Sequence, residues 1–167
     1  VQELTNHGHD VFIQDNAGFG AGFENVDYEK AGAKITPTAS DIFNDSEMIV
    51  KVKEPQSQEV SMLKENQLLF TYLHLSAAPE LTKGLVESKS ICIAYETVTD
   101  ENNRLPLLAP MSAVAGRMPI QAGSHCLEKP QGGRGLLIGG APGVNPGNVL
   151  ILGGGVVGEN AATIATG

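Results

Sequence analysis

The sequence predicts an α/β fold, with a doubly wound parallel-sheet domain followed by the beginning of a second α/β domain. Two observations predict the first domain. Short apolar runs rich in Val, Ile and Leu occur at residues 48–53, 68–73 and 91–95, and helical segments separate them. Such runs are typical of parallel strands that helices cover on both faces. A third observation, a glycine-rich run after another apolar stretch near residue 150, predicts the second domain.

The elements before the first long strand are short. Residues 1–7 have the composition of the end of a helix, and Gly8 is its stop signal. The following segments are expected to be a loop at 16–22, a short helix at 26–33, a brief strand at 34–36 and a helical turn at 40–44. Because the chain starts partway through a helix without an initiator Met, we expect it to be part of a longer protein.

The later elements are clearer. We expect helices at 57–64 and 81–87 between the three strands, a polar turn at 100–104 and a longer helix at 112–129. Ser112 is expected to cap this last helix. Pro119 lies inside it and predicts a kink or a break into two helices, because proline removes a backbone donor. A Gly/Pro-rich connection at 131–147 leads into a strand at 149–152. We therefore expect domains at 1–108 and 109–167.

Composition excludes several classes of function. The net charge is −8, with 11 Lys and Arg among 167 residues, which disfavours nucleic acid as a partner. No apolar run reaches the roughly 18 residues of a membrane helix, and the N-terminus is not a signal peptide, so a cytoplasmic protein is the simplest interpretation. Cys92 and Cys126 are expected to be buried thiols rather than a disulfide or redox pair. The four histidines lack the paired spacing of a zinc site, and no metal is expected.

A dinucleotide-binding motif follows the last predicted strand. Gly153-Gly154-Gly155-Val156-Val157-Gly158 satisfies the Gly-x-Gly-x-x-Gly rule, with a strand before it and a helix after it. Gly153 permits a tight turn, Gly155 lets the backbone approach a pyrophosphate, and Gly158 lets the helix pack closely on the strand. The acidic residue that holds the ribose would lie beyond Gly167, so the sequence does not distinguish NAD from NADP. A structural glycine turn is the alternative interpretation.

Two side chains with useful chemistry follow neighbouring strands. Lys53 ends the strand at 48–53, and His74 follows the strand at 68–73. Because the carboxyl ends of parallel strands meet at one edge of a sheet, both reach the edge where ligands bind. A lysine there can bind a substrate carboxylate or polarise a carbonyl, and a histidine can transfer protons near neutral pH. Glu96 lies at the same edge, where a structural role is favoured. Ser112 could contact a cofactor as well as cap a helix.

Taken together, these segments resemble the bacterial alanine dehydrogenases over essentially the whole chain. The motifs that carry the resemblance are Lys51-Val52-Lys53-Glu54-Pro55, Leu69 to Leu75, Ile93 to Val98, Leu105 to Ser112, Val114-Ala115-Gly116-Arg117 and the glycine motif. The resemblance implies a Rossmann domain that binds NAD and reversible oxidative deamination of L-alanine to pyruvate and ammonia. It implies that Lys53 binds substrate, that His74 is catalytic, and that Ser112, Gly153, Gly155, Val156, Val157 and Gly158 contact the cofactor. It also implies a homo-oligomer, commonly a hexamer.

Two departures and two alternatives accompany this resemblance. Ala113 stands where the family usually has a glutamate, and Pro119 is unexpected within its helix. The first alternative is the NAD-binding subunit of proton-translocating transhydrogenase, which has a related glycine loop; His74 and the Lys-Glu-Pro sequence favour the dehydrogenase. The second is a non-catalytic fragment, because half a Rossmann unit does not enclose a cofactor. We therefore expect no dehydrogenase activity from these 167 residues alone.

Overall fold

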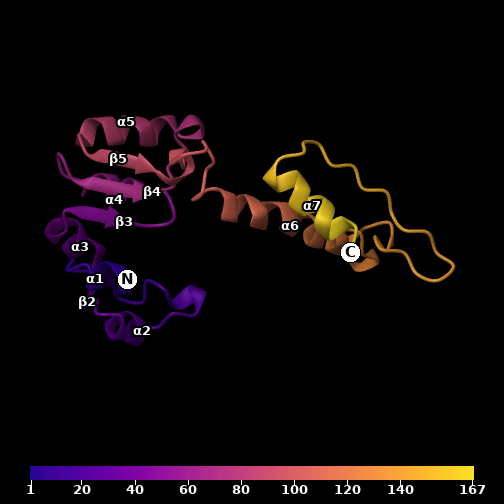
Figure 1. Cartoon of the computed structure of the whole chain (residues 1–167), viewed down its shortest axis with the longest axis horizontal. Coiled ribbons are helices and arrows are strands. Elements are labelled where there is room, and N and C mark those ends of the chain that lie inside the picture. Colours follow the sequence, from indigo (N-terminus) through magenta and orange to yellow (C-terminus); the bar gives the residue numbers. More distant parts are fainter. The chain divides into compact units, whose positions relative to one another are not determined.

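The computed structural model describes all residues from Val1 to Gly167 and divides into two compact units, Val1–Glu96 and Thr97–Gly167. The first unit contains two parallel sheets. Strand β1 (Phe12–Gln14) pairs with β2 (Lys34–Thr36), and β3 (Met48–Val50), β4 (Leu68–Thr71) and β5 (Ile91–Ala94) form the second sheet in that order. Figure 1 shows β3, β4 and β5 side by side. The α/β class and the parallel pairing are confirmed.

Short helices connect these strands. They are α1 (Gln2–Asn6), the 3-10 turn η1 (Phe19–Ala21), α2 (Asn25–Lys30), α3 (Ala39–Asp45), α4 (Ser57–Val60), η2 (Leu75–Ala77), α5 (Pro79–Ser88) and η3 (Tyr95–Thr97). Several begin where a side chain can satisfy the unpaired amides of a first turn. The Thr38 hydroxyl accepts from the amide of Asp41 at the start of α3, and Gln56 and Glu59 form a capping box on α4. Local sequence therefore determines where these helices start.

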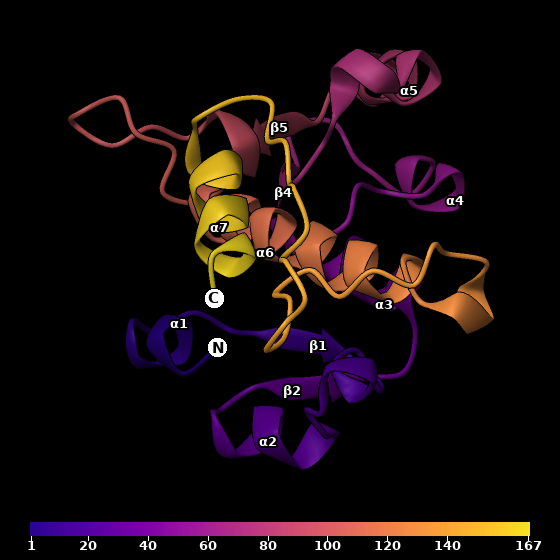
Figure 2. The ribbon, with the colours of Figure 1, turned by 90° about the vertical axis from the view of Figure 1, so that its right-hand side faces the viewer.

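The core of the first unit lies between the three-stranded sheet and its helices. Its buried residues are Phe43, Ile49, Leu63, Leu69, Leu73 and Leu85. Strand residues alternate between the two faces, so Ile49 and Leu69 point toward the helices while their neighbours point away. Figure 2 shows α4 and α5 on the same side of β4 and β5. The other face stays exposed at Met48, Val50, Ile91 and Ile93. In this chain the helices therefore lie against one face of the three-stranded sheet.

The strands of the second sheet are shorter than predicted, but their hydrogen bonding continues further. After β3, the Lys51 amide donates to the Phe70 carbonyl at 3.2 Å, and after β4 the Tyr72 amide donates to the Val52 carbonyl at 3.3 Å. Backbone pairing thus reaches Val52 and Tyr72, one residue short of the predicted ends at 53 and 73. This continuation carries Lys53 and His74 to the carboxyl edge of the sheet.

The second unit consists of α6 (Ala109–Cys126), the 3-10 turn η4 (Lys129–Gln131), a long connection and α7 (Val156–Ala165). Helix α6 is a single helix with Pro119 inside it, so of the two expected outcomes, a kink or a break into two helices, the break is wrong. It also begins earlier than predicted. The amide of Ser112 donates to the carbonyl of Leu108, so Ser112 lies within the helix and its expected capping role is wrong. No helix of the structure combines the length and the apolar character needed to cross a membrane.

The predicted strand at 149–152 does not form. These residues are assigned to no regular element, and Leu150 and Leu152 are 84% and 89% exposed. An isolated extended segment leaves its backbone donors and acceptors to water, and a strand needs a neighbour to pair with. No strand of the chain pairs with this segment. The prediction therefore identified an apolar segment correctly but not its pairing.

Candidate functional site

Lys53 is held at the end of β3 by a buried hydroxyl on the next strand. Thr71 is fully buried, and its hydroxyl lies 2.9 Å from the carbonyl of Lys53 and 3.1 Å from that of Val52. Because one hydroxyl hydrogen is shared by these two acceptors, Thr71 fixes the chain where it leaves the sheet. The Lys53 side chain itself is 75% exposed. The buried anchor is therefore combined with an exposed ammonium group.

Glu54 connects Lys53 with His74. One of its carboxylate oxygens, Oε1, lies 3.2 Å from Lys53 Nζ, and the other, Oε2, lies 3.4 Å from His74 Nδ1. The structure thus brings the two predicted residues to one carboxylate at the carboxyl edge. Lys51, two residues earlier, pairs instead with Glu59, and both of those side chains are about four-fifths buried. Lys53 rather than Lys51 is the lysine with an accessible charge.

His74 has a backbone conformation that few non-glycine residues adopt. Its φ is 50° and its ψ is 37°, in the left-handed region. Glu96, which follows β5, stabilises this turn. Its Oε1 accepts from the amide of His74 at 2.7 Å and from that of Leu73 at 3.1 Å. A carboxylate that accepts two successive amides fixes the backbone from which the imidazole projects.

Both carboxylates of this cluster favour the ionised form. The pKa of Glu54 is lowered, first by its own backbone amide and then by the side chain of Lys53, against a smaller opposing effect of burial. For Glu96, burial is the largest single effect and acts to raise the pKa. The amides of His74, Glu96 and Leu73 together outweigh it, so the pKa is lowered. Both groups are therefore anionic near neutral pH.

Three aromatic rings pack in a row that ends at the imidazole of His74. The ring of Tyr72 stacks on the imidazole of His74, with centroids 5.8 Å apart and planes 18° from parallel. Tyr72 also meets Tyr95 edge to face at 5.0 Å, and Tyr95 meets Phe70 at 4.3 Å. Burial raises the pKa of Tyr95, with a further contribution from Tyr72. These contacts limit the movement of the imidazole on one side and leave 58% of the His74 side chain exposed.

The glycine motif of the second unit forms the turn into α7. Gly153 has a φ of 103°, which side chains rarely tolerate. A Cβ on Gly158 would overlap the carbonyl oxygen of Gly153, so the helix approaches the loop as closely as glycine allows. Gly155 differs from both, because its φ is −83° and a Cβ there would meet nothing within 4 Å. The fold gives no reason for a glycine at 155, whereas a ligand lying against the loop would.

The start of α7 has the free donors that a phosphate needs. The first bond into the helix runs from the amide of Glu159 to the carbonyl of Gly155, and the amides of Val156, Val157 and Gly158 have no protein acceptor. These amides and the helix dipole favour an anion. The residues present therefore fit the pyrophosphate of a dinucleotide.

Ser112 lies near this loop within the second unit. Helix α6 packs on α7 at Gly116, where a Cβ would overlap the carbonyl oxygen of Val157. Ser112 is one turn before Gly116 on the same side of α6. Its side chain is half-buried and makes no hydrogen bond within the protein. Close by, Arg117 donates to the amide oxygen of Asn160 at 3.0 Å, which joins the two helices.

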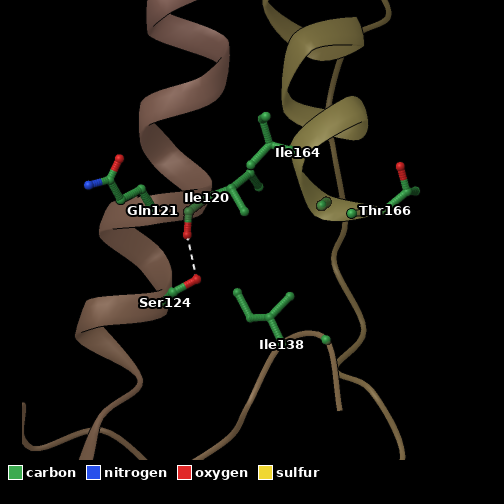
Figure 3. Close-up of a pocket in the computed structure, with 9 residues that line it drawn as sticks. Ile120, Gln121, Ser124, Ile138, Ile164 and Thr166 are labelled. Atoms are coloured by element: carbon green, nitrogen blue, oxygen red, sulfur yellow. Dashed lines mark hydrogen bonds between the residues drawn. The ribbon is translucent and has the colours of Figure 1, made fainter. Parts of the chain in front are cut away.

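A hollow of about 420 Å³ lies elsewhere in the second unit. Ile120, Gln121 and Ser124 of α6 line it together with Ile138, Gly139 and the last four residues of the chain, Ile164 to Gly167. Figure 3 shows Ile120, Ile138 and Ile164 pointing toward one another across it. It is at the opposite end of α7 from the glycine loop and contains none of the candidate residues. We therefore assign it no part in the site.

The sequence places Glu96 at the same edge, where it could orient a neighbour although a structural role is favoured, and the structure shows that this neighbour is His74. The sequence places Glu54 only within a motif and does not indicate its contact with His74. Their contacts cross from one strand end to another, and no spacing along the chain indicates such contacts. The one available signal was that both follow strands of a parallel sheet, at the edge where His74 was already expected.

Comparison with known proteins gives the family. The family model described as "Alanine dehydrogenase/PNT, N-terminal domain" matches residues 1–115, and that described as "Alanine dehydrogenase/PNT, C-terminal domain" matches residues 119–167. Proteins named alanine dehydrogenase match the whole chain at 57% identity in Halomonas elongata, 52% in Bacillus subtilis and 48% in Mycobacterium tuberculosis. The chain spans 44–45% of the length of these relatives.

Solved structures agree. A structure titled L-alanine dehydrogenase matches with a TM-score of 0.90 and 55% identity, over 98% of this chain and 45% of its own. A transhydrogenase structure from Sinorhizobium meliloti matches with a TM-score of 0.79 over 98% of this chain and 48% of its own. At 22% identity, the second likeness shows the fold alone. On the strength of two family models that together cover almost every residue, the chain belongs to the alanine dehydrogenase/PNT family.

Proposed function

We propose that the full-length protein carrying this sequence catalyses NAD-dependent, reversible oxidative deamination of L-alanine to pyruvate and ammonia. One observation carries the proposal. In a chain 48–57% identical to proteins named alanine dehydrogenase, Lys53 and His74 meet one carboxylate at the carboxyl edge of a parallel sheet. That edge is where open α/β sheets bind ligands. The transhydrogenase alternative has no comparable support, because its similarity extends to the fold only.

Lys53 is proposed to bind the substrate and polarise its carbonyl group. Its ammonium is 75% exposed and rests against Glu54 at 3.2 Å, so a substrate carboxylate or carbonyl oxygen can reach it without unfolding any structure. The anchor at Thr71 fixes the backbone from which it projects. A fixed charge at this place orients the reacting carbon, which is a large part of what an enzyme contributes.

His74 is proposed to transfer protons to and from the reacting oxygen. Imidazole changes charge near neutral pH, so it can both accept and return a proton in a reversible reaction. With Nδ1 directed toward Glu54, Nε2 is the nitrogen available to the substrate. Lys53 and His74 thus have separate roles on the same substrate.

The cofactor-binding residues are proposed to be Ser112, Gly153, Gly155, Val156, Val157 and Gly158. NAD bound there would accept the hydride that leaves the substrate α-carbon. The support is the open space at Gly155 and the unpaired amides of the first turn of α7. The Ser112 hydroxyl, which has no partner in the protein, is available to the same ligand. The choice of NAD rather than NADP and the homo-oligomeric state remain predictions from the resemblance. The cytoplasmic location and the domain boundary at 108/109 remain predictions from the sequence pattern.

The test is formation of NADH by the purified full-length protein. We expect an absorbance increase that requires both L-alanine and NAD, and the reverse reaction with pyruvate, ammonia and NADH. No turnover with L-alanine would overturn the proposal. The isolated chain Val1–Gly167 should show no turnover, since residues 149–152 have no partner strand to form the nucleotide-binding sheet. Activity of the isolated chain would contradict that part.

A further inference from the structure

The turn that presents His74 is held in an uncommon conformation by a group from another strand end. His74 is one of five non-glycine residues with positive φ, and three of the others are asparagines, which tolerate that region better. The carboxylate of Glu96 accepts hydrogen bonds from both amides of the turn, those of Leu73 and His74. A backbone that is unfavourable in isolation persists when its surroundings hold it in place.

The imidazole ring is held by a second carboxylate. Glu54 Oε2 lies 3.4 Å from His74 Nδ1, and the Tyr72 ring stacks on the imidazole face. An ionised carboxylate only accepts hydrogen bonds, so this contact requires the hydrogen on Nδ1. The lone pair of neutral His74 is then on Nε2. A carboxylate partner commonly fixes which imidazole nitrogen reacts.

We propose that Glu54 and Glu96 are positioning residues for His74: Glu96 fixes the backbone of its turn, and Glu54 fixes the tautomer that leaves Nε2 free for the substrate. This inference rests on the proposed proton-transfer role of His74. It assigns to both carboxylates an effect on rate; Glu54, which also contacts Lys53 at 3.2 Å, bears on substrate affinity as well.

Two other carboxylates of the first unit, Glu59 and Glu65, make different contacts. Glu59 near the same edge neutralises Lys51 and contacts no candidate residue. Glu65 pairs with Lys89 at 3.5 Å just before β4, at the amino end of that strand and so opposite His74. Glu65 therefore offers a matched control: a carboxylate of the same unit whose ion pair has nearly the same length as the Glu54 contact with His74 but lies at the other edge.

The first experiment reads the tautomer directly. Nitrogen NMR of histidine-labelled full-length protein should show neutral His74 with its hydrogen mainly on Nδ1. Glu54→Gln should move the population toward the Nε2-protonated form that free histidine prefers, because an amide can donate as well as accept. Glu65→Gln should leave it unchanged. An unchanged tautomer in the Glu54→Gln protein would overturn the role of Glu54 whether or not the protein oxidises alanine.

The second experiment separates positioning from folding. Glu54→Gln and Glu96→Gln should each lower kcat for L-alanine at least about tenfold, with the KM for NAD within about twofold of the original. Glu65→Gln should keep the original kcat. Melting curves of the Glu54→Gln and Glu65→Gln proteins should nearly coincide, whereas Glu96→Gln should melt somewhat lower because its carboxylate holds the His74 turn. Glu54→Asp should recover part of the rate. Normal kcat in the Glu54→Gln and Glu96→Gln proteins would overturn the inference, whereas absence of alanine-dependent NADH formation in the unaltered protein would instead contradict the proposed function.

Discussion

Gly155→Ala separates a glycine required by the ligand from one required by the fold. The alanine Cβ would meet no protein atom within 4 Å, and the φ of −83° suits any residue. Replacing Gly by Ala stabilises a compatible site by about 0.4–1 kcal/mol through the unfolded chain. Gly155 is also the N-cap of α7, where alanine is less favourable than glycine. This loss of stability is similar in size to the gain and opposes it. We therefore expect the free energy of unfolding to change by less than about 1 kcal/mol.

Cofactor binding should respond quite differently. A methyl group at 155 would occupy the space beside the first turn of α7 where the pyrophosphate is proposed to lie, next to unpaired amides. We expect the affinity for NADH to fall at least tenfold, which is about 1.4 kcal/mol. Calorimetric titration of the full-length protein measures this, and thermal unfolding measures stability in parallel.

Two other glycines serve as controls. Gly123→Ala in α6 also meets no atom within 4 Å and should leave NADH affinity unchanged while stabilising the helix by about 0.5–1 kcal/mol. Gly158→Ala should lose both stability and affinity, by about 1–3 kcal/mol in stability, because its Cβ overlaps the Gly153 carbonyl. If Gly155→Ala binds NADH as tightly as the original protein, the proposed contact between the loop and the pyrophosphate is refuted.

Three further predictions concern single side chains. Thr71→Val should lower the free energy of unfolding by about 1–3 kcal/mol in urea titration, because the carbonyl of Lys53 loses its buried donor; unchanged stability would contradict the anchor. Pro119→Ala should raise the free energy of unfolding by about 1–3 kcal/mol, because the exposed proline lacks the backbone N–H that α6 would use at this position. A decrease in thermal stability would contradict this and would show that the proline ring makes stabilising contacts. The pKa of Glu96 is lowered below its usual 4.5, so its stabilisation of the His74 turn is complete above about pH 4.5 and lost as the pH falls through the lower pKa. The NMR shift of the His74 amide should follow that loss and should not titrate in Glu96→Gln.

Local sequence was sufficient where an element depends on its own residues. The strand at 34–36 forms as predicted, and Gly8 ends the first helix with a φ of 85°. The start of α6 was missed although a signal existed: Pro110 lies in its first turn, where proline is favoured. Ser112 looked like a cap only because the helix was expected to begin later.

Features that depend on distant residues could not be predicted in this way. Apolar character at 149–152 indicates a strand, but pairing needs a neighbour that no local pattern supplies. Because the carboxyl ends of neighbouring parallel strands lie at one edge of the sheet, the sequence could predict that Lys53 and His74 are close together. The carboxylate contacts of Glu54 and Glu96 depend on side-chain directions at three separate strand ends, so only the structure reveals them.

The most direct test of the account is the turnover of L-alanine by the full-length protein with single substitutions at the carboxyl edge. We predict alanine-dependent NADH formation by the unaltered protein and a loss of at least about a hundredfold in kcat for His74→Ala, with NADH affinity retained. Lys53→Met should raise the KM for L-alanine as well as lower kcat. Undiminished turnover in the His74→Ala protein would contradict the central claim that this edge of the sheet carries the chemistry.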